Sequence, residues 1–386
     1  MNRDHSPLGA SAAERYINCP GSVRLAEKIQ PPTIEPEYTR HGIAAHKLVA
    51  FALSNYHEVW EVLEQDWGCE FSLLEVQAMQ DFIDLVRSRI AVFKQAYGEV
   101  TTFIEFPMHR PELHELFYGT LDVGIVAGDE AEIIDYKHGA GIAVDAVGNA
   151  QLRMYAIGFI LDLPEVRRVR LRISQPRAFH PDGPDRSDDI EVPDLMRWFD
   201  MVLFPAMELA DPRRSNHDTM IFNPGEWCRF CPAKRQCPAL DQQMLEVNQI
   251  DVPADYSNKE LGTLYECLPT VKIRIAAIEA EVHARNIRDP TKLVPGSKLV
   301  AAKAIRQWKD GAEDALAVLG PDRYTTPALK SPSQLENEFG ARAKKLTKIW
   351  AEAPDNGYTT APISDRRKAV SLNKPVDNYQ AYLETR

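Results

Sequence analysis

Cysteine is scarce in this chain, and long apolar runs are missing from it. Six cysteines in 386 residues are too few for a disulfide-stapled secreted protein. The N-terminus also lacks the basic start, apolar run and small-residue cleavage site of a signal peptide. No segment approaches the roughly 20 apolar residues that span a bilayer. We therefore expect a cytoplasmic protein with reduced thiols and no membrane association.

Basic side chains are outnumbered by acidic ones. Lysine and arginine total 45 against 56 aspartates and glutamates, which gives a formal net charge of −11. Such a chain cannot coat a polyanion by bulk attraction, although a local basic site is compatible with this total. The 44% hydrophobic and 26% charged residues are typical of a globular protein. The length favours two or three structural units.

Hydrophobic periodicity indicates helices on both sides of a group of strands. Residues 38–53, 73–97 and 146–163 carry apolar side chains at helical intervals. We expect the polar, turn-rich segment 180–189 to be a loop, and the first three strands to form an antiparallel meander. Short β-branched segments bounded by glycine and proline predict these strands at 101–108, 119–128, 131–139 and 167–178.

These elements predict an α/β fold in which helices flank a mixed sheet. We divide the chain into a helical N-terminal part at 1–100, a core at 101–240 and a mainly helical C-terminal extension at 241–386. Within the extension, residues 269–287 have a clear helical period, and residues 292–310 have strand or turn character.

Three cysteines gather in the segment GEWCRFCPAKRQCPAL, residues 225–240. The C-x-x-C-x₅-C spacing of Cys228, Cys231 and Cys237 indicates thiolates around metal, because no hydrophobic core requires such a density. A closed zinc site and a cubane iron–sulfur cluster each take four protein ligands, so this segment lacks one. Cysteine-only ligation leaves zinc and iron–sulfur both open.

A further cysteine lies near the N-terminus. Ser11 and Glu14 have the S-x-x-E spacing of a helix capping box, so a short helix is expected to end at Cys19. The following proline–glycine pair breaks this helix and is expected to expose the cysteine side chain. Cys69 and Cys267 fall outside any such arrangement and are expected to be ordinary buried thiols.

Two acidic residues and a lysine lie on neighbouring predicted strands. Asp135 and Lys137 are two apart in a strand and therefore face the same side. Asp122 lies mid-strand in YGTLDVGIV, and a hairpin through AGDE brings it close to Asp135. Two carboxylates that close are tolerated mainly around a divalent cation, with a backbone carbonyl as a further ligand. The alternative is a surface ion pair on an edge strand together with a turn aspartate.

Three further polar side chains flank this group in the sequence. Gln151 and Tyr155 lie one helical turn apart on one face, and His46 follows Gly42 in HGIAAH. Taken singly, each has a structural explanation: a solvated glutamine, a half-buried core tyrosine and a satisfied core histidine. Their order along the chain, rather than any one of them, indicates a shared site.

The order G-x-x-x-H, GT-x-D, D-x-K and Q-x-x-x-Y resembles the RecB-like branch of the PD-(D/E)XK nuclease superfamily. The resemblance implies a PD-(D/E)XK core and a metal-dependent DNA nuclease, more specifically an exonuclease that processes DNA ends. Asp135 stands where many members have glutamate, a change that this branch accepts. The residues assigned by the resemblance are the Mg²⁺ or Mn²⁺ ligands His46, Asp122, Asp135 and the Tyr136 carbonyl, the water-orienting Lys137, and Gln151 and Tyr155 beside the scissile strand.

Iron–sulfur members of this branch, which include Cas4 and the AddB-type nucleases, have one cysteine before the nuclease core and three after it. By this resemblance, a [4Fe–4S] cluster is bound here, with zinc as the alternative metal. Hydrolysis needs no electron transfer, so the metal is expected to act as a staple between the two flanks of the core. The implied ligands are Cys19, Cys228, Cys231 and Cys237.

Segments at 15–27, 293–310 and 362–370 resemble the phage- and prophage-associated family named DUF2800. This resemblance covers nearly the whole chain and implies a role near DNA replication or recombination in the host-cell cytoplasm. The implied partners are DNA and a phage single-strand-binding or annealing protein, and a homo-oligomer is compatible with them. Two other functions stay open: a catalytically silent DNA-binding or assembly module, and a zinc-stapled protein-interaction protein.

Overall fold

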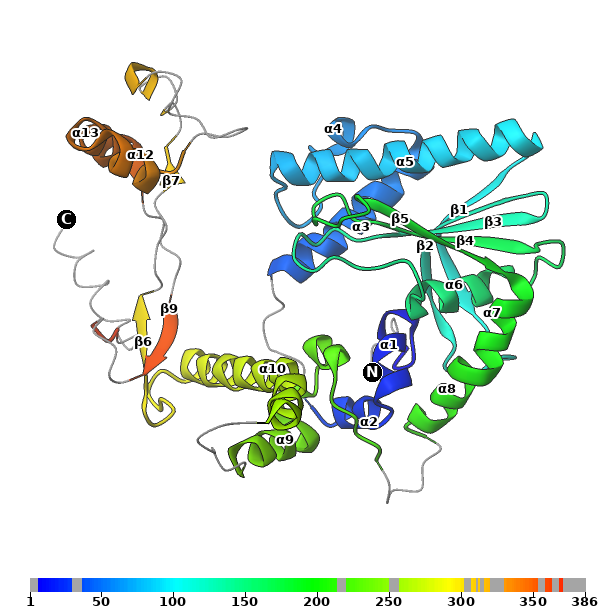
Figure 1. Cartoon of the computed structure of the whole chain (residues 1–386). Coiled ribbons are helices and arrows are strands. Elements are labelled where there is room, and N and C mark those ends of the chain that lie inside the picture. The colour runs from blue at the N-terminus through cyan, green and yellow to red at the C-terminus, as the bar shows by residue number, and fades with distance from the viewer. Residues whose placement is uncertain are drawn as a thin grey trace, which may run out of the picture. The chain divides into compact units, whose positions relative to one another are not determined.

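A computed structural model gives the structure of the chain (Figure 1). It describes residues 6–29, 37–213, 220–249, 257–301, 307–309, 312, 316–319, 330–352, 358–362 and 368–370. The chain divides into two compact units, Met1–Arg274 and Ile275–Arg386. All of the predicted site residues belong to the first unit.

The first unit is built on a five-stranded mixed sheet. In spatial order its strands are β1 (Thr101–His109), β2 (Tyr118–Ala127), β3 (Glu130–Tyr136), β4 (Arg168–Ser174) and β5 (Asp185–Glu191). The first three form antiparallel pairs, so the predicted meander is confirmed. β4 runs parallel to β3 because helix α6 (Ala150–Ile160) connects them, and β5 returns antiparallel to β4.

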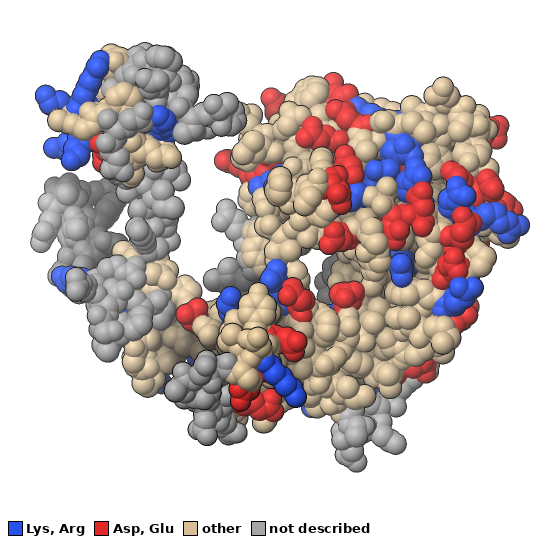
Figure 2. Space-filling view, viewed as in Figure 1, with Lys and Arg blue, Asp and Glu red and all other residues tan. Residues whose placement is uncertain are grey.

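The expectation of a loop at 180–189 is wrong in its second half, which is strand. β5 lies at the edge of the sheet, and its acidic side chains pair with arginines of β4. Arg170 Nε lies 2.7 Å from Asp189 Oδ1, and Arg168 Nε lies 2.9 Å from Glu191 Oε1. Figure 2 shows Lys and Arg interspersed with Asp and Glu on this face of the unit. Such cross-strand ion pairs stabilise a strand with few apolar residues, which hydrophobic periodicity therefore misses.

Helices cover both faces of the sheet, with an apolar core on each side (Figure 1). The α/β class with helices flanking a mixed sheet is therefore confirmed, and α3 and α5 match the ranges predicted from periodicity to within two residues. One face packs against α3 (Glu37–Asn55), α4 (Val59–Val62) and α5 (Leu73–Tyr97). The other face packs against α1 (Ala13–Asn18), α6, α7 (Val192–Trp198), the π-helix Phe199–Leu203 and α8 (Phe204–Ala210).

The N-terminal helix forms without the predicted capping box. α1 follows a 3-10 turn at Ala10–Ala12, and its N-cap Ala12 makes no side-chain hydrogen bond. Packing against α6 and α8 stabilises this short helix instead: Tyr16 is fully buried, and its hydroxyl contacts Met154 Sδ at 3.3 Å. The helix does end at Cys19, as predicted, but the cysteine side chain is buried rather than exposed.

The segment that carries the other three cysteines returns to the N-terminus. Gly21 N, at the start of α2 (Gly21–Glu27), donates to Ile221 O at 2.9 Å. A Cβ at Gly21 would lie 2.8 Å from that oxygen, so only glycine fits this approach. The segment continues through the 3-10 helices Glu226–Phe230 and Lys234–Gln236 into α9 (Pro238–Gln249) and α10 (Asn258–Arg288).

The described part of the C-terminal extension is mainly helical, as expected, and the second unit also contains two short strand pairs, one strand of each lying within the predicted strand or turn segment 292–310. Leu316, Leu335 and Ala343 form a small core within it. No helix among the described residues is long and apolar enough to cross a bilayer. The elements are the pair β6 (Ser297–Ala301) and β9 (Tyr358–Pro362), the pair β7 (Gln307–Trp308) and β8 (Ala351–Glu352), and helices α12 (Pro332–Phe339) and α13 (Ala341–Trp350).

Candidate active site

In β1 and β2, the regular alternation of side chains between the two faces of the sheet is interrupted at one pair of neighbouring positions. Residues two apart in a regular strand face the same side, yet Leu121 and Val123 pack into opposite cores. The same change occurs in β1 between Ile104 and Phe106. Glu105 lies at the point of change with a φ of +46°, a conformation that is uncommon for residues other than glycine.

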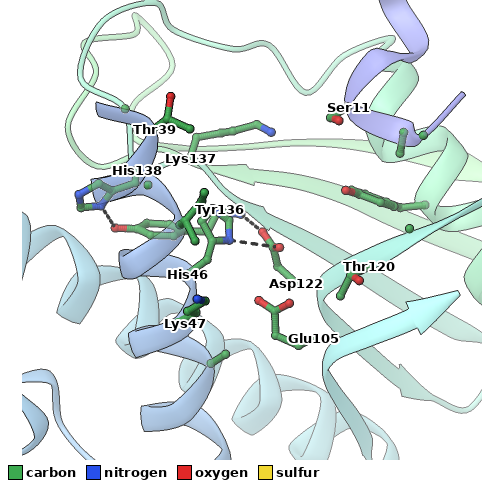
Figure 3. Close-up of a pocket in the computed structure, with 18 of the residues that line it drawn as sticks. Ser11, Thr39, His46, Lys47, Glu105, Thr120, Asp122, Tyr136, Lys137 and His138 are labelled. Carbon is green, nitrogen blue, oxygen red and sulfur yellow. Dashed lines mark hydrogen bonds and ion pairs between the residues drawn. The ribbon is translucent and has the colours of Figure 1, made fainter. Parts of the chain in front are cut away.

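This distortion places Glu105 opposite Asp122. The neighbours of these two residues pair in register on either side of them, and His46 reaches the same place from α3. The ligand atoms of the three side chains all lie within 4.8 Å of one another, and Figure 3 shows them converging. Among the residues that the structure describes, no other group of three His, Cys, Asp or Glu side chains approaches this closely.

Asp122 is held from two sides. His46 Nδ1 lies 3.3 Å from its Oδ1, and the backbone N–H of Tyr136 donates to its Oδ2 at 2.8 Å (Figure 3). Burial acts to raise the pKa of Asp122, but the His46 charge and these hydrogen bonds outweigh it and lower the pKa. Burial likewise acts to lower the pKa of His46, and the Asp122 carboxylate raises it overall. Asp122 is therefore ionised, as a metal ligand must be.

Glu105 faces a like charge. Burial raises the pKa of Glu105, and the nearby Asp122 carboxylate raises it further. Two carboxylates this close repel each other unless a cation or a proton lies between them. Two carboxylates and one imidazole are a donor set that fits a divalent cation.

Asp135 belongs to a polar chain that leads to α6. Its Oδ2 lies 2.7 Å from Lys137 Nζ, and its Oδ1 accepts from Gln151 Nε2 at 2.9 Å. Lys137 Nζ also donates to Gln151 Oε1 at 2.8 Å, and Gln151 Nε2 lies 3.4 Å from the Tyr155 hydroxyl. Burial raises the pKa of Asp135; Lys137 opposes this shift and Asp122 adds to it.

The structure brings the sequence-predicted residues together, in two groups rather than one. His46 and Asp122 form the first group with Glu105, whereas Asp135 lies with Lys137 in the second group, on the side of α6. Tyr136 contacts the first group through its backbone N–H. Sequence reasoning missed Glu105, and the available signal was a lone acidic residue in the otherwise apolar strand segment FIEFPM.

Both groups border a cavity of about 920 Å³. Its walls come from α3, β1, β2, the end of β3 and the N-terminal residues around Ser11 (Figure 3). The basic side chains Lys47 and Lys137 line it, and the acidic side chains that line it are Glu105 and Asp122. The negative charge of the wall is thus confined to the candidate metal ligands.

A buried polar network supports the end of β3. The Tyr136 hydroxyl lies 2.9 Å from His138 Nδ1, and His138 Nε2 lies 3.3 Å from Glu75 Oε1. Glu75 Oε1 also contacts His41 Nδ1 and Arg177 Nη1, both at 3.1 Å. Burial opposes ionisation of Glu75, but hydrogen bonds from Ser72, the N-cap residue of α5, and from His138 and His41 lower its pKa to about 2.

The four cysteines predicted to share a metal line a small closed cavity of their own, called here the cysteine cavity. The backbone N–H of Asn223 donates to Cys19 Sγ, and that of Gly225 donates to Cys228 Sγ, both at 3.4 Å. Hydrogen bonds of this kind are typical of thiolates that bind iron. All four side chains are buried free thiols: Cys19, Cys228, Cys231 and Cys237.

The cysteine cavity needs positive charge to hold thiolates. Burial raises the pKa of Cys19 and Cys231, and it raises the pKa of Cys228 to about 11. Arg15 and Lys234 line the same cavity and supply part of that charge. A bound metal centre would supply the rest, because metal binding deprotonates a thiol outright. The donor set therefore fits a bound metal centre.

The two remaining cysteines lie apart from this cavity. Cys69 and Cys267 are half-buried, not fully buried as expected. Cys267 Sγ accepts a hydrogen bond from Gln243 Nε2 at 3.7 Å. Neither residue lines the cysteine cavity.

A family model described as "Protein of unknown function (DUF2800)" matches residues 5–368. The match confirms the family resemblance predicted from three short segments, and it extends into both compact units. The description names no activity, so the function must be inferred from the geometry of the site.

Proposed function

The chain belongs to the DUF2800 family, and we propose that it is a metal-dependent deoxyribonuclease with a RecB-like PD-(D/E)XK core. The observation that carries this proposal is the convergence of His46, Glu105 and Asp122. They meet in a cavity that is otherwise lined by basic and neutral side chains. A divalent cation and a phosphodiester together match that distribution of charge.

The donor set favours Mg²⁺ or Mn²⁺. Carboxylate oxygens suit both ions, and an imidazole nitrogen suits Mn²⁺ better than Mg²⁺. Three protein ligands leave positions open for water and for phosphate oxygens, which a catalytic site requires. The Asp135 carboxylate and the Tyr136 carbonyl would complete the proposed ligand set of a bound cation.

The residues of the second group position the nucleophile. Lys137 Nζ, held by Asp135 and Gln151, orients the attacking water and neutralises charge on the phosphate. The water oxygen forms a bond to phosphorus as the bond from phosphorus to the leaving oxygen breaks; one proton of the water passes to solvent, and the leaving oxygen takes a proton from solvent. Gln151 and Tyr155 contact the scissile strand. The cation, when bound, stabilises the developing negative charge and lowers the pKa of the water.

DNA is the proposed substrate, and its contact with the protein is local. The chain carries a net charge of −11, and the face seen in Figure 2 presents acidic and basic groups interspersed rather than a broad basic surface. Phosphate binding therefore depends on local basic side chains such as Lys47 and Lys137 of the active-site cavity. We propose that the enzyme acts from DNA ends, as an exonuclease in phage recombination or replication.

The cysteine cavity is proposed to hold a [4Fe–4S] cluster rather than zinc. The four cysteines line one closed cavity and supply the four ligands that either centre takes. What favours the cluster is the resemblance to the iron–sulfur nucleases, with one cysteine before the core and the C-x-x-C-x₅-C segment after it.

Digestion of end-labelled linear DNA and of closed circular DNA, each with Mg²⁺ or Mn²⁺, tests the proposal. We expect the linear molecule to be degraded, the circular one to persist, and EDTA to stop the reaction. Loss of the circular molecule would show an endonuclease. A purified protein that retains its iron and binds DNA, yet degrades neither molecule, would be a silent DNA-binding module.

A further inference from the structure

A second cavity, of about 890 Å³, lies along the outer edge of β1. β1 is at the end of the described sheet, so this edge is paired with no other described strand. The cavity is walled by the end of α3, by α5, and by Thr101, Thr102 and Ile104 of β1. None of these residues lines the active-site cavity.

The second cavity continues the line of the active-site cavity. Ala50 of α3 lines the first cavity, and Leu53 and Ser54, about one helical turn further on, line the second. On β1, Glu105 lines the first cavity and its neighbour Ile104 lines the second. The two cavities thus adjoin along α3 and β1, and together they are called here the α3–β1 groove.

Tyr56 stands at the far end of the groove in a backbone conformation that does not suit tyrosine. Its φ is +60°, directly after the last residue of α3, and His57 N donates to Ala52 O at 2.9 Å. This helix-ending motif prefers glycine, and any side chain there carries a steric cost. The tyrosine side chain is 88% exposed, so its packing does not offset that cost.

Ion pairing fixes the turn that carries Tyr56. Arg87 Nη1 lies 2.7 Å from Glu58 Oε1, and Arg87 Nη2 donates to His57 O at 2.8 Å. The exposed ring is thus presented from an anchored backbone. An exposed aromatic ring on a rigid support is the kind of surface on which nucleobases stack.

The charges along the groove suit a polyanion. Lys47 and Lys137 line its first section, and Lys94 lines its second section, where Arg87 is already paired with Glu58. Apart from the candidate metal ligands, Glu99 is the acidic residue on its walls. This local excess of basic groups contrasts with the acidic chain as a whole.

From these observations we infer that the α3–β1 groove binds the segment of a single DNA strand beyond the scissile phosphate, with a base stacked on Tyr56. The inference rests on the proposed nuclease function. It specifies the substrate as a single strand that passes through the active site rather than ending in it. An exonuclease built in this way releases short oligonucleotides, because it cuts several nucleotides from the end.

The groove sets the expected product length. Ten residues separate His46 from Tyr56, which is about 15 Å along a helix at 1.5 Å per residue. Phosphates of a stacked strand lie about 3.4 Å apart along the axis, so the groove spans about four nucleotides.

Binding of a fluorescent dT12 strand to full-length Asp135→Asn protein tests the inference without cleavage. Tyr56→Gly should weaken binding about 5- to 150-fold, which corresponds to the loss of one stacked base. Glycine suits this backbone, so the thermal stability should be kept or raised. Tyr56→Trp should bind as tightly as the parent. Tyr265→Ala, which removes a 74% exposed ring outside the groove, is the matched control and should change nothing.

Equal affinity of the Tyr56→Gly protein and its parent for dT12 overturns the inference. In the active protein, end-labelled single strands should give products of about four nucleotides, and Tyr56→Gly should shorten them. Release of mononucleotides by the unmodified protein also overturns it.

The groove and the nuclease activity can fail separately. Protein that binds dT12 through Tyr56 but cuts no DNA with either cation would contradict the nuclease proposal and support the groove as a DNA-binding surface. Cleavage that Asp122→Asn abolishes, while Tyr56→Gly alters neither affinity nor product length, would support the nuclease and remove the groove.

Discussion

The carboxylate site and the cysteine site of the first unit are assembled in different ways. The carboxylate site takes its residues from α3 and from strands β1, β2 and β3, which neighbour one another in sequence and in the sheet. The cysteine site joins the two flanks of the core, and its Cys19–Asn223 contact bridges 204 residues. The sheet can keep its shape without one carboxylate ligand, whereas the cysteine site is itself a connection between distant segments.

The two sites also differ in their access to solvent. The carboxylates border a cavity of about 920 Å³ and His46 is half-exposed, so a cation there keeps open positions and exchanges with solvent. The four cysteines are buried in a closed cavity. Open coordination is typical of catalytic metals and closed coordination of structural ones. We therefore expect ligand substitutions to cost activity at the first site and stability at the second.

Asp122→Asn should produce the largest effect on activity with little effect on the fold. Loss of the carboxylate removes a metal ligand and several kcal/mol of charge stabilisation, so the cleavage rate should fall on the order of 1,000-fold or more. Rates on linear DNA and circular dichroism measure the two properties.

Asp129→Asn provides the matched control in the same hairpin. Asp129 is exposed in the turn between β2 and β3, away from the cavity. Its substitution should leave the rate unchanged. Cleavage by Asp122→Asn at the rate of the unmodified protein would remove the active-site assignment.

Cys19→Ser should produce the largest effect on stability. It removes a ligand from the proposed centre, which would close a chain segment of more than 200 residues, and a cross-link of that span contributes on the order of 5 kcal/mol. The variant should lose its iron and its brown colour together with that free energy of unfolding. Iron analysis and urea unfolding check both.

Cys69→Ser and Cys267→Ser are the controls for this prediction. Both residues are half-buried outside the cysteine cavity, so both variants should keep full iron content. A Cys19→Ser protein with full iron content would contradict the assignment of the fourth ligand. Loss of stability without loss of metal would show that Cys19 acts through packing alone.

Glu75→Gln should alter the pH dependence of stability. The pKa of Glu75 is about 2, below its ordinary value of 4.5, so the ionised group contributes stability that is fully present above about pH 4.5. That contribution, up to about 3 kcal/mol, is lost as the pH falls toward 2. Urea unfolding at pH 7 and pH 3 should show a difference between variant and parent that shrinks at pH 3.

The matched control for Glu75 is Glu70→Gln, an exposed residue just before α5. Its stability should follow that of the parent at both pH values. A difference between Glu75→Gln and the parent that stays constant with pH would contradict the role of the ionised carboxylate in the network around His138.

Much of the fold follows from local patterns in the sequence. Helical periodicity located α3 and α5, and β-branched runs bounded by glycine located the meander. β5 was missed because ion pairs with Arg168 and Arg170, not apolar alternation, stabilise it. The capping box at Ser11 was wrong because burial of Tyr16 stabilises α1 without a cap.

The candidate site was predictable where spacing alone sets neighbours. A hairpin brings Asp122 toward Asp135, and one helical turn brings Gln151 to Tyr155. Glu105 was not predictable in this way. Regular strand alternation assigns the Glu105 side chain to the wrong face of the sheet. The interrupted alternation and the positive φ that direct it toward Asp122 arise only in the paired strands.

Glu105→Gln tests the comparison between the carboxylate site and the cysteine site, and its expected effect on stability is the smallest of these substitutions. Without metal, Glu105 and Asp122 repel each other, and both burial and this repulsion raise the pKa of Glu105. Removing one charge should therefore leave the protein in EDTA as stable as its parent or slightly more stable, by less than about 1 kcal/mol.

With Mn²⁺, the parent should gain thermal stability and the variant should gain much less, because cation binding adds stability only to the extent of its affinity. The Mn²⁺ concentration for half-maximal cleavage should rise at least about tenfold. Glu64→Gln, an exposed residue outside both cavities, should leave all three measurements unchanged. If Glu105→Gln destabilised the metal-free protein and left the Mn²⁺ requirement unaltered, Glu105 would be a structural residue of the sheet, and the carboxylate site would be no more tolerant of ligand loss than the cysteine site.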